Sequence, residues 1–346
     1  MPVRVAGGED QPDGVHPHGE SSPRLVAAPA NHLALVWPNN IKVEGRKWPA
    51  AMLRFSRSDD GGQTWSTPIT LNDDTTGALV SHQFHGATLV GDSGLAVGWL
   101  DERAAVAPVA SGADGHAEHA AEPDAQIYLT TSNDFGQSWG PNRIGWDAAC
   151  PCCRVSLARS SDGQAVAGWR KHFPGNVRDV VTAAISEQPG EPERVHPDDW
   201  AYEGCPHSGP AIATGADAST HVVWYNGKQG AAGVYYARRA GDKSTPAVPL
   251  VQGKALGVAH PAVVSLPGGG ALAAYDVSPD GKRLIRVAQL LPSGKVGAQQ
   301  QVPGSEDGKY PQLAVLDSTT GVVVWTESRG DGSRLRLARI SLDRRR

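Results

Sequence analysis

The 346-residue sequence contains no run of 18 or more apolar residues, and this absence excludes a membrane-spanning helix. It also lacks an excess of basic residues, because 32 Lys and Arg stand against 36 Asp and Glu and the formal net charge is −4. No global positive field is therefore present to hold nucleic acid or an anionic membrane. We therefore expect that the protein does not bind nucleic acid and that no helix of it spans a membrane.

Its first residues, MPVRVAGGED, do not have the basic and apolar regions of a signal peptide. Composition leaves two locations open, namely a cytosolic protein and the mature part of an exported one. Aromatic residues are scarce at 6%, whereas 41 Gly and 26 Pro are present. Such a mixture is typical of short strands that are joined by many tight turns.

One pattern of a short apolar strand, a turn and a second strand ending in an aromatic occurs six times. The copies span 21–37, 85–99, 153–169, 208–224, 260–275 and 310–325, and they close with Trp37, Trp99, Trp169, Trp224, Tyr275 and Trp325. A period near 50 residues without helical periodicity predicts an all-β, six-bladed β-propeller with about four antiparallel strands per blade. We expect a single domain over 1–346, with a loop insertion around 104–126. The chain ends would share a blade, 3–6 pairing beside 334–342, because closure removes exposed sheet edges.

Two segments after predicted third strands fit the pattern S-x-D-x-G-x-[ST]-W. The matching residues are Ser58, Asp60, Gly62, Thr64 and Trp65, and Ser132, Asp134, Gly136, Ser138 and Trp139. The pattern predicts a rigid turn in which Asp accepts backbone N–H bonds and Gly adopts a positive φ. These repeats resemble those of the Asp-box, or bacterial neuraminidase repeat, superfamily, whose sialidase members are six-bladed propellers. The motif is a feature of the fold and does not identify a chemistry.

The four cysteines are clustered, with three of them in ACPCCR (149–154) and the fourth in GCPHSGP (204–210). In a propeller, the loops that lead into the innermost strands converge at one end of the central channel. We therefore expect the candidate ligands to lie on one rim, namely Cys150, Cys152, Cys153, Cys205, His207, His85 and His260. Thiolates with imidazoles form a soft site that suits copper(I), with zinc(II) as the alternative metal.

Other interpretations of the cysteines stay open at this stage. Cys205 could form a disulfide with a member of the cluster, although the adjacent Cys152 and Cys153 are poorly placed to bridge each other. A redox thiol site is a third possibility. Among the imidazoles, His207 is the stronger candidate, because Cys205 and His207 can face the same side of an extended segment. His85 and His260, each at the start of a strand, could instead be rim residues bonded to backbone.

Taken together, the Asp-box repeat, ACPCCR and GCPHSGP resemble a group of exported bacterial sialidase-like propellers that are distinct from true sialidases. The resemblance implies a periplasmic or secreted protein, and a periplasmic metal-handling protein is a possible partner. Catalysis is left open. A sialidase needs an arginine clamp, a tyrosine nucleophile with a glutamate, and an acid/base aspartate. The residues that could be assigned such roles are Arg24, Arg103, Arg154, Tyr310 and Glu327, but no motif fixes them. The alternative function is therefore a disulfide-stabilised propeller that binds or hydrolyses carbohydrate.

Overall fold

A computed structural model describes residues 18–45, 49–74, 79–104, 124–241, 243–253, 257–330 and 332–342, together with Val3 and Val5. Most of the insertion expected around 104–126 lies outside these residues, as do residues 4 and 6. The expected pairing of the chain ends therefore stays a prediction. Within the described residues, no helix has the length and apolar character needed to cross a membrane.

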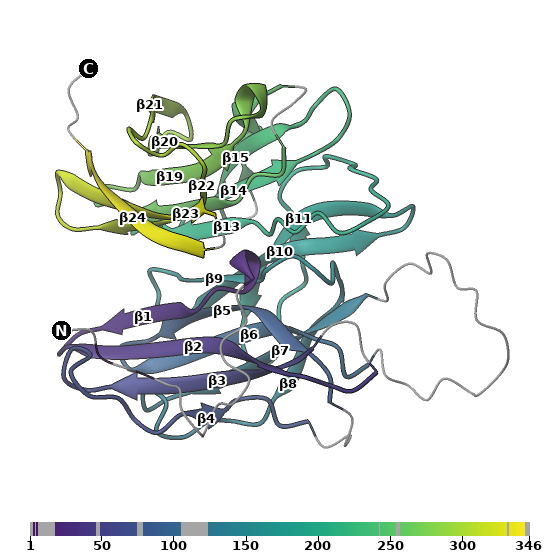
Figure 1. The fold of residues 1–346 in the computed structure, drawn as a ribbon, viewed down its shortest axis with the longest axis vertical. Helices are drawn as coiled ribbons and strands as arrows, with labels where there is room; N and C mark the ends of the chain where they lie inside the picture. The colour runs from purple at the N-terminus through teal and green to yellow at the C-terminus, as the bar shows by residue number, and fades with distance from the viewer. Residues whose placement is uncertain are drawn as a thin grey trace, which may run out of the picture.

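The chain folds as an all-β, six-bladed propeller of antiparallel sheets (Figure 1). Blade 1 contains β1 (Arg24–Ala28), β2 (His32–Ile41), β3 (Ala50–Ser58) and β4 (Ile69–Thr70). Blade 2 contains β5 (His82–Val90), β6 (Gly94–Asp101), β7 (Ala125–Ser132) and β8 (Arg143–Ala149). Blade 3 contains β9 (Ser156–Arg159), β10 (Ala165–Phe173), β11 (Val177–Ile185) and β12 (Glu193–Arg194), and it is joined to blade 2 where Ala149 of β8 pairs with Lys171 of β10.

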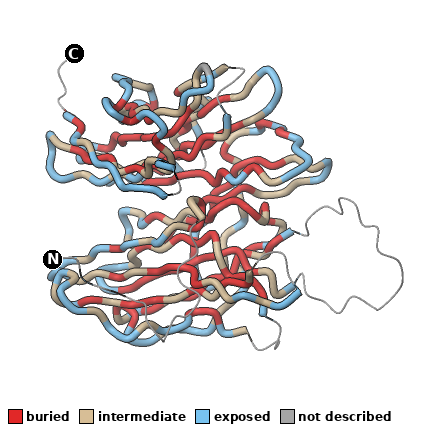
Figure 2. The backbone as a smooth tube through the Cα atoms, viewed as in Figure 1, coloured by how far each residue is buried: buried red, intermediate tan, exposed pale blue. Residues whose placement is uncertain are grey.

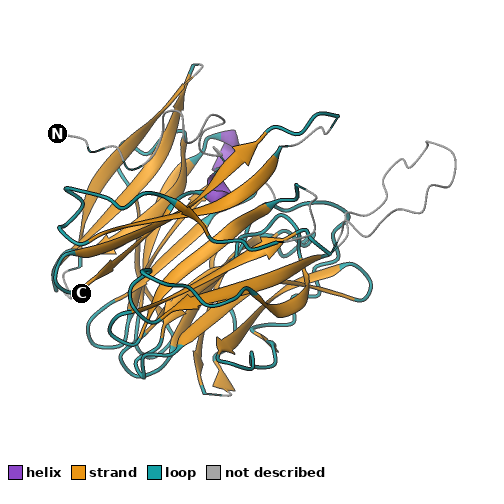
Figure 3. Cartoon of the chain, turned by 90° about the horizontal axis from the view of Figure 1, so that it is seen from below, coloured by secondary structure: helices purple, strands orange, loops and turns teal. Residues whose placement is uncertain are grey.

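The second half of the chain forms three further blades. Blade 4 contains β13 (Ala211–Thr214), β14 (Thr220–Asn226) and β15 (Gly233–Ala240), and both β16 (Lys243–Ser244) and β17 (Val248–Gln252) pair with β15. Blade 5 contains β18 (Pro261–Ser265), β19 (Ala271–Val277), β20 (Leu284–Leu290) and β21 (Val296–Gln301). Blade 6 contains β22 (Gly308–Val315), β23 (Thr320–Arg329) and β24 (Gly332–Ser341). Two 3-10 turns, η1 (Gly19–Ser21) and η2 (Pro279–Gly281), complete the described elements, and Figure 3 shows how strands dominate the fold.

The core is a series of apolar layers between neighbouring blades, and the buried tube segments of Figure 2 follow the strands. All six closing aromatics lie on second strands and are almost fully buried. From Trp99 onward, each of these aromatics lies in an apolar cluster that also contains residues of the preceding blade. For example, the ring centroids of Trp169 and of Trp146 in blade 2 lie 4.5 Å apart. The sequence repeat thus corresponds to five apolar layers, one between each pair of consecutive blades from blade 1 to blade 6.

The two S-x-D-x-G-x-[ST]-W turns have nearly identical geometry. In the first, the Asp60 carboxylate accepts the Thr64 N–H at 2.9 Å and the Thr64 hydroxyl at 2.6 Å. The Ser58 hydroxyl oxygen accepts the N–H of Gly62, whose φ is 88°. The second turn repeats these bonds from Asp134 and Ser132. Both turns therefore have the geometry that the motif predicts.

The six innermost strands surround a central cavity of about 290 Å³. Its lining includes one residue from each of these strands: Arg24, Gly86, Ser156, Ala211, Pro261 and Gln312. At the seam between blades 1 and 6, the Arg24 guanidinium donates to the Gln312 side chain at 3.4 Å. In Figure 1 the η1 turn lies between the group of blades that starts at β1 and the group that ends at β24.

Candidate metal centre

The turn that carries three cysteines connects blade 2 to blade 3. Strand β8 ends at Ala149, and the Cys150 N–H then donates to the Arg170 carbonyl of β10 at 2.9 Å. The next residue is Pro151, which favours the second position of a tight turn because its ring presets φ. The Cys153 N–H donates to the Cys150 carbonyl at 3.4 Å and closes the turn. The sequence C-P-C-C therefore directs three side chains toward one point.

The three sulfurs of this turn form a compact triangle, which we call the inner triad. The Sγ atoms of Cys150 and Cys153 lie 3.4 Å apart, those of Cys150 and Cys152 3.8 Å, and those of Cys152 and Cys153 4.0 Å. A soft metal about 2.3 Å from each of three sulfurs would hold them about 3.8–4.0 Å apart. The triangle is thus close to the size that a three-thiolate site requires.

The inner triad belongs to the core between blades 2 and 3. Cys150, Cys152 and Cys153 are all buried and pack in the apolar cluster that contains Trp169. Within the described part of the chain, no cysteine lines the central cavity. The cysteines therefore gather, but the inner triad lies between two blades and not at the central cavity where it was expected. Their surroundings exclude water from the sulfurs.

A second group of ligand atoms, which we call the outer triad, joins the first through one shared cysteine. Sulfurs of Cys152 and Cys205 and a ring nitrogen of His207 all lie within 4.8 Å of one another. Cys205 is half-buried and His207 is exposed, so this group opens toward solvent. His207 has a φ of 48°, an unusual value for a non-glycine residue that holds its ring beside Cys205. Cys205 and His207 thus lie together as expected, but through a left-handed residue and not through the extended segment that their spacing predicted.

Two buried guanidinium groups adjoin the inner triad. The Arg178 side chain donates to the Cys150 sulfur at 3.1 Å, to the Tyr202 carbonyl and to the Asn176 side chain. Arg170 donates only to backbone carbonyls, for example that of Tyr225 at 2.8 Å. Within the described residues, neither guanidinium contacts a carboxylate. Two positive charges thus lie beside the sulfurs without an acidic partner.

These surroundings affect the three thiols differently. Hydrogen bonding with Cys152 and Cys153, followed by the charges of Arg178 and Arg170, holds the pKa of Cys150 well below its ordinary value. Hydrogen bonding to Cys150 and Cys153 raises the pKa of Cys152, and burial raises that of Cys153. Cys150 is therefore the cysteine that these contacts favour as a thiolate.

The structure does not bring His85 and His260 into either triad. The buried His85 ring contacts the Val36 carbonyl through Nε2 at 3.0 Å. His260 Nδ1 lies 2.8 Å from Asp276, and its ring is 4.1 Å from that of Tyr310. His85, which lies inside β5, thus bonds to backbone as the alternative expected, whereas the partner of His260 is a carboxylate. The ligands that the structure groups are Cys150, Cys152, Cys153, Cys205 and His207.

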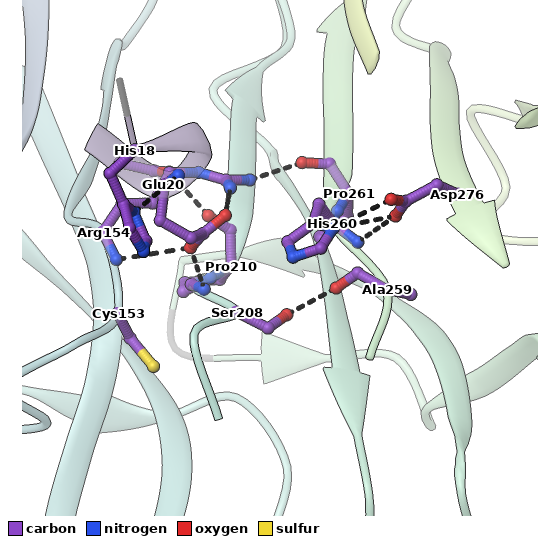
Figure 4. A network of polar contacts seen from close by, with 12 residues as sticks. His18, Glu20, Cys153, Arg154, Ser208, Pro210, Ala259, His260, Pro261 and Asp276 are labelled. Atoms are coloured by element: carbon purple, nitrogen blue, oxygen red, sulfur yellow. Dashed lines mark hydrogen bonds and ion pairs between the residues drawn. The ribbon is translucent and has the colours of Figure 1, made fainter. Parts of the chain in front are cut away.

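A separate polar network, which we call the channel mouth, lies beside the central cavity, whose lining includes Arg154 and Pro261 (Figure 4). Its key residue was not expected from the sequence. Glu20 of η1 is fully buried and forms an ion pair with Arg154. Its carboxylate also accepts the Gly209 N–H at 2.6 Å. Nη2 of the Arg154 guanidinium donates to the Pro261 carbonyl of blade 5. In Figure 4 the sulfur of the neighbouring Cys153 points away from this network.

The residues considered for a sialidase reaction are not assembled as that reaction requires. Glu327 contacts three arginines, among them Arg334 at 2.8 Å, and no hydrogen bond joins it to Tyr310 within the described residues. Arg103 is bound to Asp101 at 2.9 Å. Arg154 is occupied by Glu20, so a substrate carboxylate would have to displace that residue first.

A comparison with protein-family models finds no match, and a comparison with curated proteins finds none either. Solved structures do match. An α-L-arabinanase from Penicillium chrysogenum, complexed with arabinobiose, is 17% identical with a TM-score of 0.58 over 93% of each chain. The NanB sialidase of Streptococcus pneumoniae is 9% identical with a TM-score of 0.58, covering 99% of this chain and 70% of its own. An intramolecular trans-sialidase from Ruminococcus gnavus is 10% identical with a TM-score of 0.55, covering 97% and 99%.

This chain has a sialidase-like propeller fold. At such low identities the likeness concerns the fold alone, and a function has to be argued from the residues of this chain.

Proposed function

We propose that this protein binds a soft transition metal, copper(I), through the cysteine cluster and His207. The observation that carries the proposal is the inner triad itself, three buried sulfurs at 3.4–4.0 Å beside two guanidiniums. Soft thiolates select copper(I) or zinc over hard cations, and a buried all-sulfur site protects copper(I) from solvent. Metal handling is the role that this chemistry supports.

The local charge favours copper(I) over zinc(II). Three thiolates with copper(I) carry a net charge of −2, and the charges of Arg170 and Arg178 offset it. The same thiolates with zinc(II) carry −1, which leaves one buried positive charge without compensation. Because uncompensated charge in a protein interior is costly, the pair of arginines fits the monovalent ion better.

Two finer elements complete the proposal. The first concerns the family: the hydrogen-bonded turns at Asp60 and Asp134 support placing this protein in the Asp-box superfamily. Within it, the protein would belong to a branch that carries cysteine and histidine ligands. An exported, periplasmic location would suit a protein that holds copper(I) in thiolates and so prevents redox cycling of the free ion. A periplasmic metal-handling protein would be the partner that delivers or receives it.

The proposal is tested by anaerobic competition for copper(I) against a colorimetric chelator. We expect the wild-type protein to withdraw copper(I) from the chelator, and Cys152→Ser, Cys153→Ser and Cys205→Ser each to weaken this competition. His32→Ala is a matched control, because His32 lies on blade 1 and bonds to Asp59. Equal copper(I) affinity in the wild type and in a triple serine variant of these cysteines would contradict the proposal.

Thiol counting separates the metal site from the disulfide alternative. Protein purified under reducing and non-reducing conditions is analysed for metal and for free thiols. The metal site predicts four titratable thiols after metal removal together with bound metal before it. Loss of thiols without bound metal would instead support disulfides.

The carbohydrate alternative has a test of its own, because solved structures with this fold include an arabinanase and sialidases. Since Glu20 occupies Arg154, we expect no turnover of a fluorogenic sialoside above background. Robust turnover that Tyr310→Phe abolishes would favour the glycosidase over the metal-binding proposal.

A further inference from the structure

Cys152 belongs to both triads, and this double membership has consequences for stoichiometry. The inner triad joins Cys152 to Cys150 and Cys153, and the outer triad joins it to Cys205 and His207. Each group provides three soft ligand atoms within 4.8 Å of one another, enough for one copper(I) ion. We propose that the cluster binds two copper(I) ions bridged by the Cys152 thiolate. This inference rests on the proposed function.

The two sites differ in their access to solvent. All three residues of the inner triad are buried, whereas the outer triad has the half-buried Cys205 and the exposed His207. An ion from solution therefore meets the outer triad first. The inner ion can reach its site by ligand exchange at Cys152, where a bond to an inner sulfur forms as the bond to an outer ligand breaks. Copper remains in the monovalent state throughout, so no oxidant or reductant is needed, and the thiol protons pass to the buffer.

Charge balance supports two ions of this valence. Four thiolates, a neutral imidazole and two copper(I) ions carry a total charge of −2. Arg170 and Arg178 contribute +2, and neither has a carboxylate partner within the described residues. Two zinc(II) ions with the same ligands would leave both arginine charges uncompensated. The net charge of the dicopper cluster together with Arg170 and Arg178 is thus zero, which avoids the cost of an uncompensated charge between two packed blades.

The division of ligands makes variants at the two sites distinguishable. His207→Ala and Cys205→Ser remove outer ligands only; His207 is exposed and Cys205 is half-buried, so both changes disturb the core less than a change at the inner triad. Cys153→Ser removes an inner ligand only. Cys152→Ser removes the bridge and affects both sites. His32→Ala retains every proposed ligand and is the control.

The experiment loads each full-length protein anaerobically with excess copper(I), removes weakly held metal with a chelator and measures copper per chain by elemental analysis. We expect about two copper ions in the wild type and in His32→Ala, and about one in His207→Ala, Cys205→Ser and Cys153→Ser. X-ray absorption of the loaded wild type should show a copper–copper scattering path, which Cys205→Ser should lose.

The outcomes separate this inference from the function on which it rests. One copper in the wild type, unchanged by His207→Ala and Cys205→Ser, overturns the two-ion cluster and leaves copper binding intact. Two coppers in the wild type and in both outer variants refute the assignment of the outer triad. No copper in the wild type refutes the proposed function and the inference together.

Discussion

The channel mouth and the cysteine cluster are neighbours in the chain, at Arg154 and Cys153, but they satisfy their buried groups differently. At the channel mouth Arg154 pairs with Glu20 and Arg283 pairs with Asp276, whereas Arg24, which lines the same cavity, donates only to the Gln312 side chain among the described residues. In the cluster, two guanidiniums face sulfurs and backbone carbonyls. The Glu20–Arg154 ion pair is complete without a ligand, whereas the proposed copper(I) ion would complete the second region. A polar group in a central position is therefore no guide to a site by itself.

The largest effect on stability should come from the channel mouth. Glu20→Gln keeps the shape of the side chain and leaves the buried charge of Arg154 unpaired, which costs roughly 3–5 kcal/mol. Chemical denaturation of the metal-free protein measures this loss, with the exposed Glu191→Gln as control. Copper stoichiometry should not change. An unaltered unfolding midpoint would show that the ion pair does not hold η1 in place.

The next effect concerns the cluster and should appear in metal affinity. Arg178→Met removes a positive charge 3.1 Å from the Cys150 sulfur. We expect copper(I) affinity to fall about 10- to 100-fold, the range for partners that support metal ligands. Competition with a chelator measures it, and the exposed Arg329→Met should leave it unchanged. Equal affinity in both variants would refute the charge compensation argued above.

The pH dependence of stability sharpens the comparison, because it probes a histidine that the structure places outside the cluster. Burial, followed by the charge of Arg24, lowers the pKa of His85 to about 3. Below its ordinary pKa of about 6.5, the unfolded chain takes up a proton that the folded chain cannot, so stability falls as pH falls from about 6.5 toward 3. By pH 5 the loss is about 2 kcal/mol.

Thermal unfolding of metal-free protein from pH 7.5 to 5 measures this dependence. His85→Gln should flatten it, and His32→Gln, a change at a half-buried histidine, should not. A copper stoichiometry that falls in His85→Gln would return His85 to the ligand set.

The smallest effect should come from the surface turns. Asp60→Ala removes bonds to the Thr64 N–H and hydroxyl, and the melting temperature should fall by less than in Glu20→Gln. Asp92→Ala changes a fully exposed carboxylate and is the control. If Asp60→Ala melts at no lower temperature than the control, the hydrogen-bond geometry that the two turns share contributes nothing to stability.

The fold was predictable because it depends on a local pattern that is repeated. Each aromatic from Trp37 to Trp325 lies on a second strand and is buried, although each strand continues two to four residues beyond the aromatic that was expected to end it. The turns at Asp60 and Asp134 were equally predictable, since all their bonds lie within a few residues. Blade 6 differs, with three described strands where about four were expected. The partner proposed for it, 3–6, lies largely outside the described residues.

The site was predictable only in part. Local spacing alone brings Cys150, Cys152 and Cys153 together, because a proline turn converges their side chains. No sequence pattern predicts the roles of Arg178 and Glu20. Their partners, Cys150 and Arg154, are 28 and 134 residues away in the chain. Those contacts exist because the blades close into a ring.

The sequence by itself determined the propeller, its closing aromatics and the clustering of sulfur, since these follow from short-range periodicity. Only the tertiary structure decided that the sulfurs lie between blades, that Cys152 is shared and that His85 and His260 have other partners. The physical reason is that burial and charge pairing depend on which strands meet across the ring, and that information is distributed over the whole chain.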